Sequence, residues 1–105
     1  MVDLGIPQGH EQAYERPAVV IQSNDLNRLN TIVVIPTTTT LQRGAYRGTI
    51  ILQAGEGNLR EDSIALCYQI RVLDRSRLNR RLGVLSASAL EQVETTTAYV
   101  LGLAI

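Results

Sequence analysis

Arg16-Pro17-Ala18-Val19-Val20-Ile21-Gln22 joins an arginine and a proline directly to an unbroken run of apolar, mostly β-branched residues. β-Branched residues favour strands, and a proline disfavours helix at the residue before it. The segment therefore predicts a buried strand over Pro17 to Gln22, with Arg16 directly before its first residue. Because the strand anchors the backbone of Arg16, its guanidinium can meet a phosphate in a reproducible geometry.

Short β-type runs separated by turn residues make up most of the remaining chain. We expect strands over Met1 to Leu4, Thr31 to Thr40 and Gly48 to Ala54, and one or two more over Ser63 to Leu73. Pro36 indicates an edge or a bulge in the second of these. The pattern predicts a strongly curved antiparallel sheet.

The C-terminal quarter changes to a helical period. Asp74 to Arg81 is predicted as a short polar helical turn, and either Ser86 or Ser88 can cap a terminal helix. Apolar and β-branched residues then recur at helical intervals and define the expected buried face of that helix: Leu90, Val93, Thr97, Val100 and Leu101.

Length and composition favour one soluble domain over residues 1–105. The chain is 45% hydrophobic, and no apolar run approaches the roughly 20 residues of a membrane helix. The N-terminus lacks the basic segment and apolar core of a secretory signal, so we expect a cytoplasmic protein with no membrane contact. Cys67 is the one cysteine, and its apolar neighbours predict a buried small hydrophobe rather than a nucleophile.

All ten basic residues are arginines, and ten acidic residues bring the net charge to zero. A non-specific phosphate binder is usually basic overall, so any contact with nucleic acid must come from locally clustered arginines. Arginine in place of lysine can equally reflect genomic composition. Charge alone therefore does not identify a partner.

Six segments of the chain follow the pattern of one known family in order: Val2-Asp3-Leu4-Gly5, Gly9-His10-Glu11-Gln12, Arg16 to Gln22, Ile32 to Thr37, Ser63-Ile64-Ala65-Leu66 and Gln69-Ile70-Arg71-Val72-Leu73-Asp74. In these segments the chain resembles the MazF/PemK endoribonuclease toxins of type II toxin–antitoxin systems. The resemblance covers almost the whole chain and includes the terminal helix. The loop Leu41 to Gly48 is the least characteristic part.

The resemblance implies a mainly β fold with a C-terminal helix, a small SH3-like antiparallel β-barrel of the MazF/PemK/CcdB type. It also implies a homodimer that cleaves single-stranded mRNA at short sequence motifs, without a metal or cofactor. The expected products are a 2′,3′-cyclic phosphate and a 5′-hydroxyl. A cognate antitoxin protein, whose tail blocks the RNA groove, is the expected protein partner.

The catalytic arginine and threonine of the family fall on Arg16 and Thr37. Metal-independent cleavage needs help for the attacking 2′-hydroxyl, a donor for the leaving oxygen and positive charge around the phosphorane. Arg16 can hold a phosphate through two N–H donors, and a hydroxyl on a strand at Thr37 can donate to a non-bridging oxygen. Thr38 is the alternative hydroxyl, and strand alternation predicts that only one of the two lies in the site.

Four further residues are candidates for RNA binding. His10 can contact phosphate, and Glu11 can orient Arg16 or accept a proton, although both lie in a loop where ordinary surface roles are common. Gln69 can bind a base or the backbone through its amide, or it can be an ordinary exposed strand residue. Arg71 shares the strand face of Gln69, with an ion pair as its alternative role.

Two other functions remain open at this level. The same fold serves toxins of the CcdB type, which bind gyrase through an aromatic C-terminal end. This chain ends Leu101-Gly102-Leu103-Ala104-Ile105 without a tryptophan, which argues against that function. A catalytically degenerate toxin that only binds its antitoxin is the other alternative.

Overall fold

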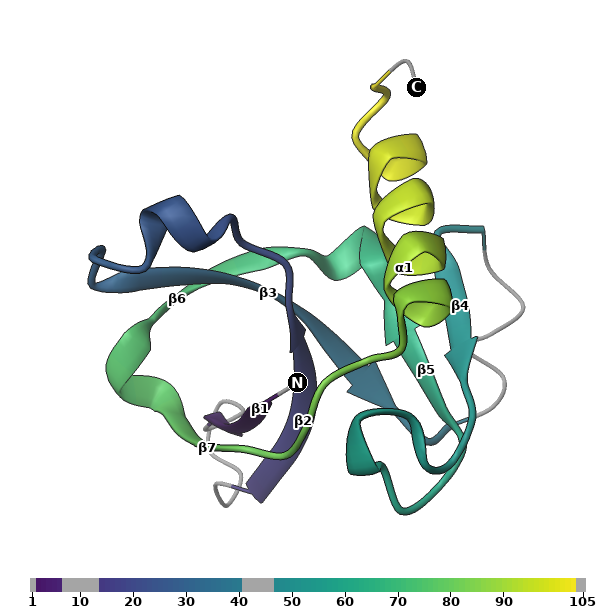
Figure 1. Ribbon diagram of the computed structural model, residues 1–105, viewed down its shortest axis with the longest axis horizontal. Helices are drawn as coiled ribbons and strands as arrows, with labels where there is room; N and C mark the ends of the chain where they lie inside the picture. The colour runs from purple at the N-terminus through teal and green to yellow at the C-terminus, as the bar shows by residue number, and fades with distance from the viewer. Residues whose placement is uncertain (1, 7–13, 41–46, 104–105) are drawn as a thin grey trace.

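A computed structural model of the chain describes residues 2–6, 14–40 and 47–103, which form a curved sheet and a C-terminal helix (Figure 1). Short 3₁₀ turns connect several of the strands: η1 (Asn24–Leu26), η3 (Glu56–Asn58), η4 (Cys67–Gln69) and η5 (Arg75–Arg77). The regular elements are β1 (Val2–Ile6), β2 (Tyr14–Val20), β3 (Thr31–Thr38), β4 (Thr49–Leu52), β5 (Ser63–Leu66), β6 (Arg71–Asp74), β7 (Leu78–Arg81) and α1 (Ala87–Val100).

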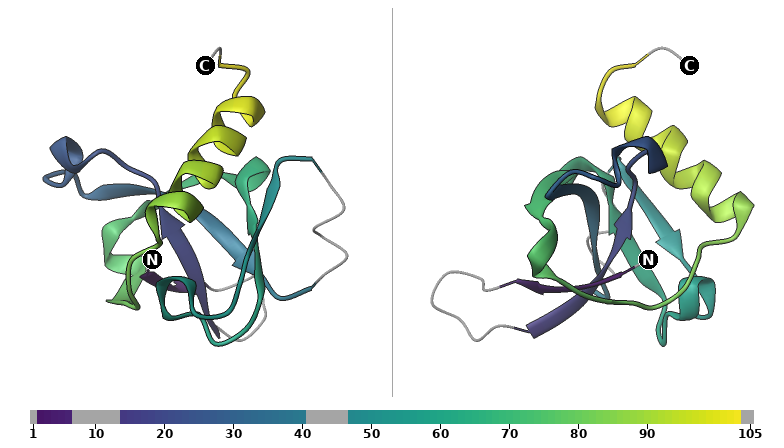
Figure 2. Two further views of the ribbon diagram at one scale, coloured as in Figure 1. Left: turned by 45° about the vertical axis from the view of Figure 1, so that its right-hand side comes forward. Right: turned by 60° about the vertical axis from the view of Figure 1, so that its left-hand side comes forward.

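The seven strands pair in the order β4-β5-β3-β2-β1-β7, and β6 joins through a second pairing with β3. Every pairing between these strands is antiparallel. The expectation of an antiparallel β fold with a C-terminal helix is therefore confirmed. The sheet curls strongly but does not close within the described residues, so the barrel expected from the resemblance is only approximate (Figures 1 and 2).

β3 is the central strand, and it changes partner along its length. One side pairs with β2 in the register Ala18↔Pro36, whereas the other side pairs first with β6 at 31–34 and then with β5 at Thr37 and Thr38. Pro36 lies between these two partners and is opposite neither. A proline, which lacks a backbone N–H, is tolerated in this central strand because the ladder is interrupted there.

Both faces of the β2–β3 pair are covered, which explains why their sequences are continuously apolar rather than alternating. Val19 and Ile35 pack into a core under α1, together with Leu52, Cys67 and Val93. The alternate face lies inside the curl of the sheet, where a second buried cluster consists of Ala18, Ile32, Val34 and Leu73. The expected burial of Cys67 is confirmed, and burial raises the pKa of its thiol.

The expected helical turn over Asp74 to Arg81 is only partly correct. The turn η5 is confined to Arg75–Arg77, and the following residues form β7, which pairs with β1 in the register Leu4↔Leu78. Asp74 begins the turn by accepting a hydrogen bond from Ser76 N–H at 2.9 Å, and hydrogen bonding from the side chain and the backbone of Ser76 lowers the pKa of Asp74. Leu78–Arg81 form a strand because they pair with β1, which lies far away in the sequence.

Strand boundaries also differ from the expected ones. The first strand runs over Val2–Ile6 rather than Met1 to Leu4, because its pairing with β2 extends to Ile6↔Tyr14. Strand β3 ends at Thr38 rather than at the expected Thr40. The hydroxyl of Thr38 accepts a hydrogen bond from Thr40 N–H at 3.2 Å, and this bond turns the chain away from the sheet. β4 is shorter than the expected Gly48 to Ala54.

Helix α1 packs against β4 and η4, and the two turned views agree on this placement (Figure 2). Ser86, rather than Ser88, is the N-cap: its hydroxyl accepts from Ala89 N–H at 3.1 Å. Val93 and Thr97 are buried as expected. Leu101 was wrongly placed on the buried face, because it follows the helix and is 52% exposed. No helix among the described residues is long and apolar enough to cross a membrane.

A carboxylate from η3 fixes the start of α1. Glu56 accepts one hydrogen bond from Ser86 N–H at 2.9 Å and another from Ser86 Oγ at 2.8 Å. These bonds lower the pKa of Glu56, because they stabilise its charged form. The negative charge also lies at the N-terminus of α1, where the helix dipole favours it.

We expect Glu56→Gln to lower the melting temperature at pH 7. Since the folded-state pKa lies below the ordinary value of 4.5, the carboxylate stabilises the fold above that value and loses its contribution as the pH falls through the folded-state pKa. The difference between variant and wild type in thermal unfolding should therefore shrink steadily from pH 5 downward. Glu94→Gln, an exposed change within α1, is the matched control, and an equal pH profile for both variants would contradict this assignment.

Candidate functional site

A pocket of about 480 Å³ lies at the end of the molecule where β2 starts and η3 follows β4. Its volume is within the range of roughly 300–1,000 Å³ that is typical of ligand sites. One wall comes from β2 and the end of β3, and the other from the residues after η3 and from β7. The lining residues are Arg16, Pro17, Thr37, Thr38, Thr39, Thr40, Asn58, Leu59, Arg60, Glu61, Ser63, Arg80 and Leu82.

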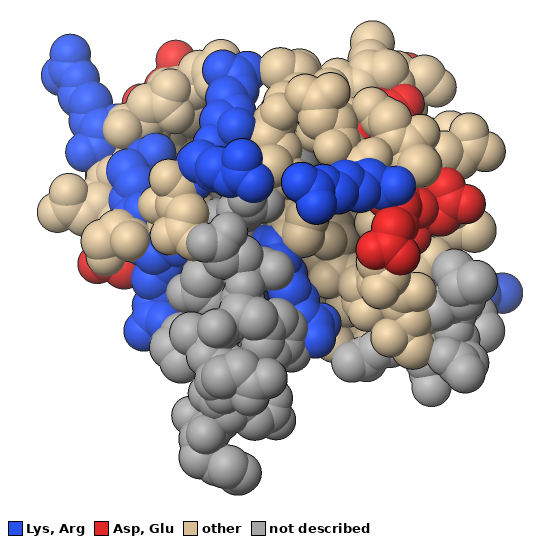
Figure 3. Space-filling view, turned by 90° about the horizontal axis from the view of Figure 1, so that it is seen from below, with Lys and Arg blue, Asp and Glu red and all other residues tan. Residues whose placement is uncertain are grey.

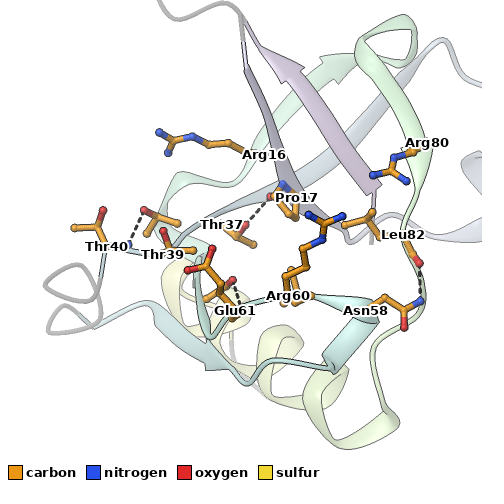
Figure 4. A pocket seen from close by; sticks show the side chains of 13 residues that line it. Arg16, Pro17, Thr37, Thr39, Thr40, Asn58, Arg60, Glu61, Arg80 and Leu82 are labelled. Carbon is orange, nitrogen blue, oxygen red and sulfur yellow. Dashed lines mark hydrogen bonds between the residues drawn. The ribbon is translucent and has the colours of Figure 1, made fainter.

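The first wall brings Arg16 and Thr37 into the same pocket. Thr37 is 3% exposed, and its hydroxyl donates a hydrogen bond to the carbonyl oxygen of Pro17 at 2.6 Å (Figure 4). This bond ties β3 to the residue that follows Arg16. The backbone of Arg16 is therefore fixed by the neighbouring strand β1, in the register Leu4↔Arg16, and by the bond from Thr37 to Pro17.

Thr38 also lines the pocket, so both threonines contribute to its wall. The strand ends at Thr38, and its hydroxyl accepts the N–H of Thr40. Thr37 is the one bonded to the segment that carries Arg16. This geometry favours Thr37 over Thr38 as the partner of Arg16.

The second wall is held in place by Asn58, which has a positive φ of 65°. Asparagine tolerates this left-handed conformation better than most residues. Its side-chain Nδ2 donates to the carbonyl oxygen of Leu82 at 2.8 Å, which fastens η3 to the chain that leaves β7. Together with the bonds from Glu56 to Ser86, this contact sets the position of Arg60 on the pocket wall.

Gly83 lets the two segments of this wall approach closely. A Cβ atom at this position would lie 2.7 Å from Asn58 Nδ2 and 2.9 Å from the carbonyl oxygen of Gly57. Both distances are shorter than ordinary van der Waals contacts, and the second involves backbone that cannot rotate away. Only glycine fits this arrangement without displacing η3.

Among the described residues that line the pocket, the charged ones are three arginines and Glu61. Arg60 and Arg80 point toward one another from separate segments, whereas Arg16 extends on the side of Thr39 and Thr40, where Glu61 also lies (Figure 4). Arginine side chains gather on this lower face of the molecule (Figure 3). The pocket is therefore suited to an anion, and its guanidinium groups can bind phosphate oxygens in pairs.

Two of the other residues predicted from sequence, Gln69 and Arg71, do not line this pocket. His10 and Glu11 lie outside the described residues. Gln69 ends η4, where its Nε2 donates to the hydroxyl of Tyr68 at 3.4 Å, and Arg71 starts β6 opposite Val34. Neither is among the lining residues, and both lie on the β6 side of β3.

Sequence reasoning missed Arg60 and placed Arg80 in the short polar helical turn predicted over Asp74 to Arg81. Arg80 instead lies in β7, which the pairing with β1 carries to the pocket. The Gly-Asn turn before Arg60 was the available signal for a tight, well-placed loop. Within the described part of the chain, no cluster of three or more His, Cys, Asp or Glu side chains could hold a metal ion.

Comparison with known proteins gives concordant results. Residues 1–101 match the family model described as PemK-like, MazF-like toxin of type II toxin-antitoxin system. An Endoribonuclease MazF from Staphylococcus epidermidis is 33% identical over 104 residues, covering 98% of this chain and 87% of that protein.

Two solved structures share the fold. A crystal structure of MazE-MazF from Deinococcus radiodurans has a TM-score of 0.80 at 27% identity, covering 98% of this chain and 92% of that one. An endoribonuclease in complex with its cognate antitoxin from a mycobacterial species has a TM-score of 0.79 at 18% identity, covering 99% of this chain and 92% of that one. The second likeness concerns the fold alone.

We expect Gly83→Ala to destabilise the fold by about 1–3 kcal/mol, because the added methyl group must push η3 away from the chain after β7. Urea unfolding monitored by circular dichroism measures this change. Val84→Ala alters the next residue, which is 65% exposed, and should stay within about 0.5 kcal/mol of wild type. Equal stability of the Gly83→Ala variant and wild type would show that this close approach is not required.

Proposed function

Because the chain belongs to the PemK-like, MazF-like toxins of type II toxin–antitoxin systems, we propose that the pocket is the active site of an endoribonuclease that cleaves single-stranded mRNA. The observation that carries the proposal is the convergence of Arg16 and Thr37 on one anion-suited pocket, joined through the Thr37–Pro17 hydrogen bond. The relative from Staphylococcus epidermidis is itself named an endoribonuclease.

The proposed reaction is an internal transesterification that needs neither metal nor cofactor. The ribose 2′-oxygen loses its proton and attacks the adjacent phosphorus, and the bond between phosphorus and the 5′-oxygen breaks. The leaving 5′-oxygen takes up a proton. The products are a 2′,3′-cyclic phosphate and a 5′-hydroxyl, so no water is consumed in this step.

Arg16 supplies the positive charge for this reaction. Charge builds up on the non-bridging oxygens of the phosphorane, and a guanidinium fixed by its strand can stabilise these oxygens through two parallel N–H donors. Arginine remains charged at all ordinary pH values, so it suits electrostatic stabilisation better than proton transfer. The tethering of Pro17 by Thr37 keeps this charge in place before RNA binds.

Thr37 has a second role in the proposal. Its hydroxyl donates to Pro17 when no RNA is bound, and rotation about the Cβ–Oγ1 bond would turn the same hydrogen toward a non-bridging phosphate oxygen. The burial of Thr37 keeps bulk water from competing for this hydrogen bond. One hydroxyl can thus first position the arginine segment and then stabilise the transition state.

The biological setting follows from the family. We propose that a cognate antitoxin neutralises the toxin by covering this pocket, that the toxin acts on mRNA in the cytoplasm, and that cleavage is sequence-specific. The family model, which is described as a toxin of type II toxin-antitoxin systems, supports the first of these. Loops around the pocket are the natural place for base selection, since single-stranded RNA is read by splayed-out bases.

We expect Thr37→Val to reduce kcat for RNA cleavage about 10²–10³-fold, as with removal of one oxyanion donor, and Thr37→Ser to restore much of it. Arg16→Lys should be nearly as damaging as Arg16→Ala, because an ammonium group lacks the paired donors. The assay is cleavage of a long single-stranded RNA in EDTA, followed by analysis of the ends.

Thr95→Val, an exposed change on α1, is the matched control and should retain full activity. Circular dichroism and thermal unfolding establish that each variant is folded. Wild-type failure to cut RNA would instead favour a gyrase-binding or degenerate toxin. Full activity of both the Arg16→Ala and Thr37→Val variants would show that the pocket is not the active site.

We also propose that the toxin is a homodimer. Three large apolar side chains at the end of α1 are more than half exposed: Tyr99, Leu101 and Leu103. Light scattering should give twice the chain mass of 11.5 kDa. Leu101→Glu should shift this mass toward the monomer, whereas Val72→Glu, an exposed change on β6, should not. A monomeric wild-type protein would exclude the dimer.

A further inference from the structure

The pocket is larger than the proposed chemistry requires. Arg16 and Thr37 need to hold only the scissile phosphate, whereas the cavity of about 480 Å³ continues past them to Arg60 and Arg80. A space of this size accommodates a nucleotide unit rather than one phosphate. The part of the pocket beyond Arg16 therefore has room for the RNA next to the cleaved bond.

The side chains of this second part suit backbone rather than base recognition. The described residues that line this part of the pocket are arginine and other non-aromatic side chains, which suit contacts with the RNA backbone better than stacking on a base. Arg60 and Arg80 direct two guanidinium groups toward one another from separate segments (Figure 4). Guanidinium groups bind phosphate oxygens through paired N–H donors, so both side chains can contact one anion placed between them.

The two arginines are also well placed before any ligand binds. Arg60 follows Asn58, which is fastened to Leu82, and Arg80 lies in β7, which pairs with β1. The contact between Asn58 and Leu82 links the two segments directly to each other. Their backbones are thus held at a set separation, which lowers the entropic cost of closing both side chains on one phosphate.

Glu61, the carboxylate among the described lining residues, lies on the side of Thr39, away from the facing pair of arginines (Figure 4). The two guanidinium groups face the same part of the pocket. A phosphate diester, with its two exposed oxygens, matches two guanidinium donors that approach from opposite sides.

We propose that Arg60 and Arg80 form a second phosphate subsite, which holds the RNA backbone one nucleotide away from the phosphate bound by Arg16 and Thr37. The assignment rests on the proposed endoribonuclease function. Its role is to bind and align the substrate: the two arginines contribute to the affinity for RNA and leave the bond-breaking step to the first site. An acidic peptide is the competing ligand, which the experiment separates from RNA.

Steady-state cleavage of a short RNA that spans a mapped cut site is the first measurement. Arg60→Gln and Arg80→Gln should each raise KM about tenfold with little change in kcat, because they remove binding shared by the ground and transition states. Arg28→Gln makes the same change of charge in the turn before β3, at a position that does not line the pocket, and should leave KM unchanged. An unchanged KM in the Arg60 and Arg80 variants, or an equal rise in the Arg28→Gln control, overturns the subsite.

Neutral linkages identify the phosphate concerned. The same RNA is made with a methylphosphonate at the phosphate on the 5′ or the 3′ side of the cut bond. A methylphosphonate at one of these two positions should raise the KM of the wild-type protein about tenfold. The same methylphosphonate should have little further effect on the KM of the Arg60→Gln, Arg80→Gln double variant, because the RNA change and the protein change remove the same contact. Fully additive effects at both positions overturn the proposal, including the case in which the arginines bind only an acidic peptide.

A binding measurement keeps the subsite separate from catalysis. The probe is a fluorescein-labelled RNA of twelve nucleotides with randomised sequence and 2′-fluoro groups, which cannot be cleaved. The double variant should bind it less tightly, and the slope of log Kd against log salt should fall by about 0.7, the value for one phosphate contact on a single strand. If the wild-type protein binds RNA but does not cleave it, only the proposed endoribonuclease function is overturned. If the double variant and the wild type have the same slope, the proposed subsite is overturned.

Discussion

Strand β3 hydrogen-bonds to three other strands, and the positions of both core and pocket depend on this constraint. One of its partners is β2, the strand that contains Arg16 and Pro17. At Pro36 its other partner changes from β6 to β5, and this change bends the sheet and leaves room for both core clusters. Thr37 is the first residue after that change. The catalytic threonine of the proposed site is thus placed by the point at which the sheet changes direction.

Local sequence was a sufficient guide where one short segment determines its own structure. The apolar runs after Arg16 and Thr31 predicted the two central strands, and helical spacing predicted α1, because burial on both faces or on one stripe leaves a direct pattern. β7 was not predictable in this way: Leu78–Arg81 is polar apart from Leu78, and only its pairing with β1 makes it a strand.

The same distinction applies to the site. Arg16 and Thr37 were predicted through the family resemblance, and both line the same pocket. Arg60 and Arg80 could not be placed together from sequence, because their meeting depends on the contact between Asn58 and Leu82 and on a distant strand pairing. Glu56 illustrates how closely fold and site are connected, since the turn that leads to Arg60 also fixes the first residue of α1 through Ser86.

The exclusive use of arginine has a consequence for the conditions under which the pocket can act. Three arginines line the pocket, and each can bind phosphate oxygens through its paired N–H donors. Dissolved salt screens charged groups and weakens each contact with phosphate. The affinity of this pocket for an anionic ligand therefore depends on the ionic strength of its surroundings.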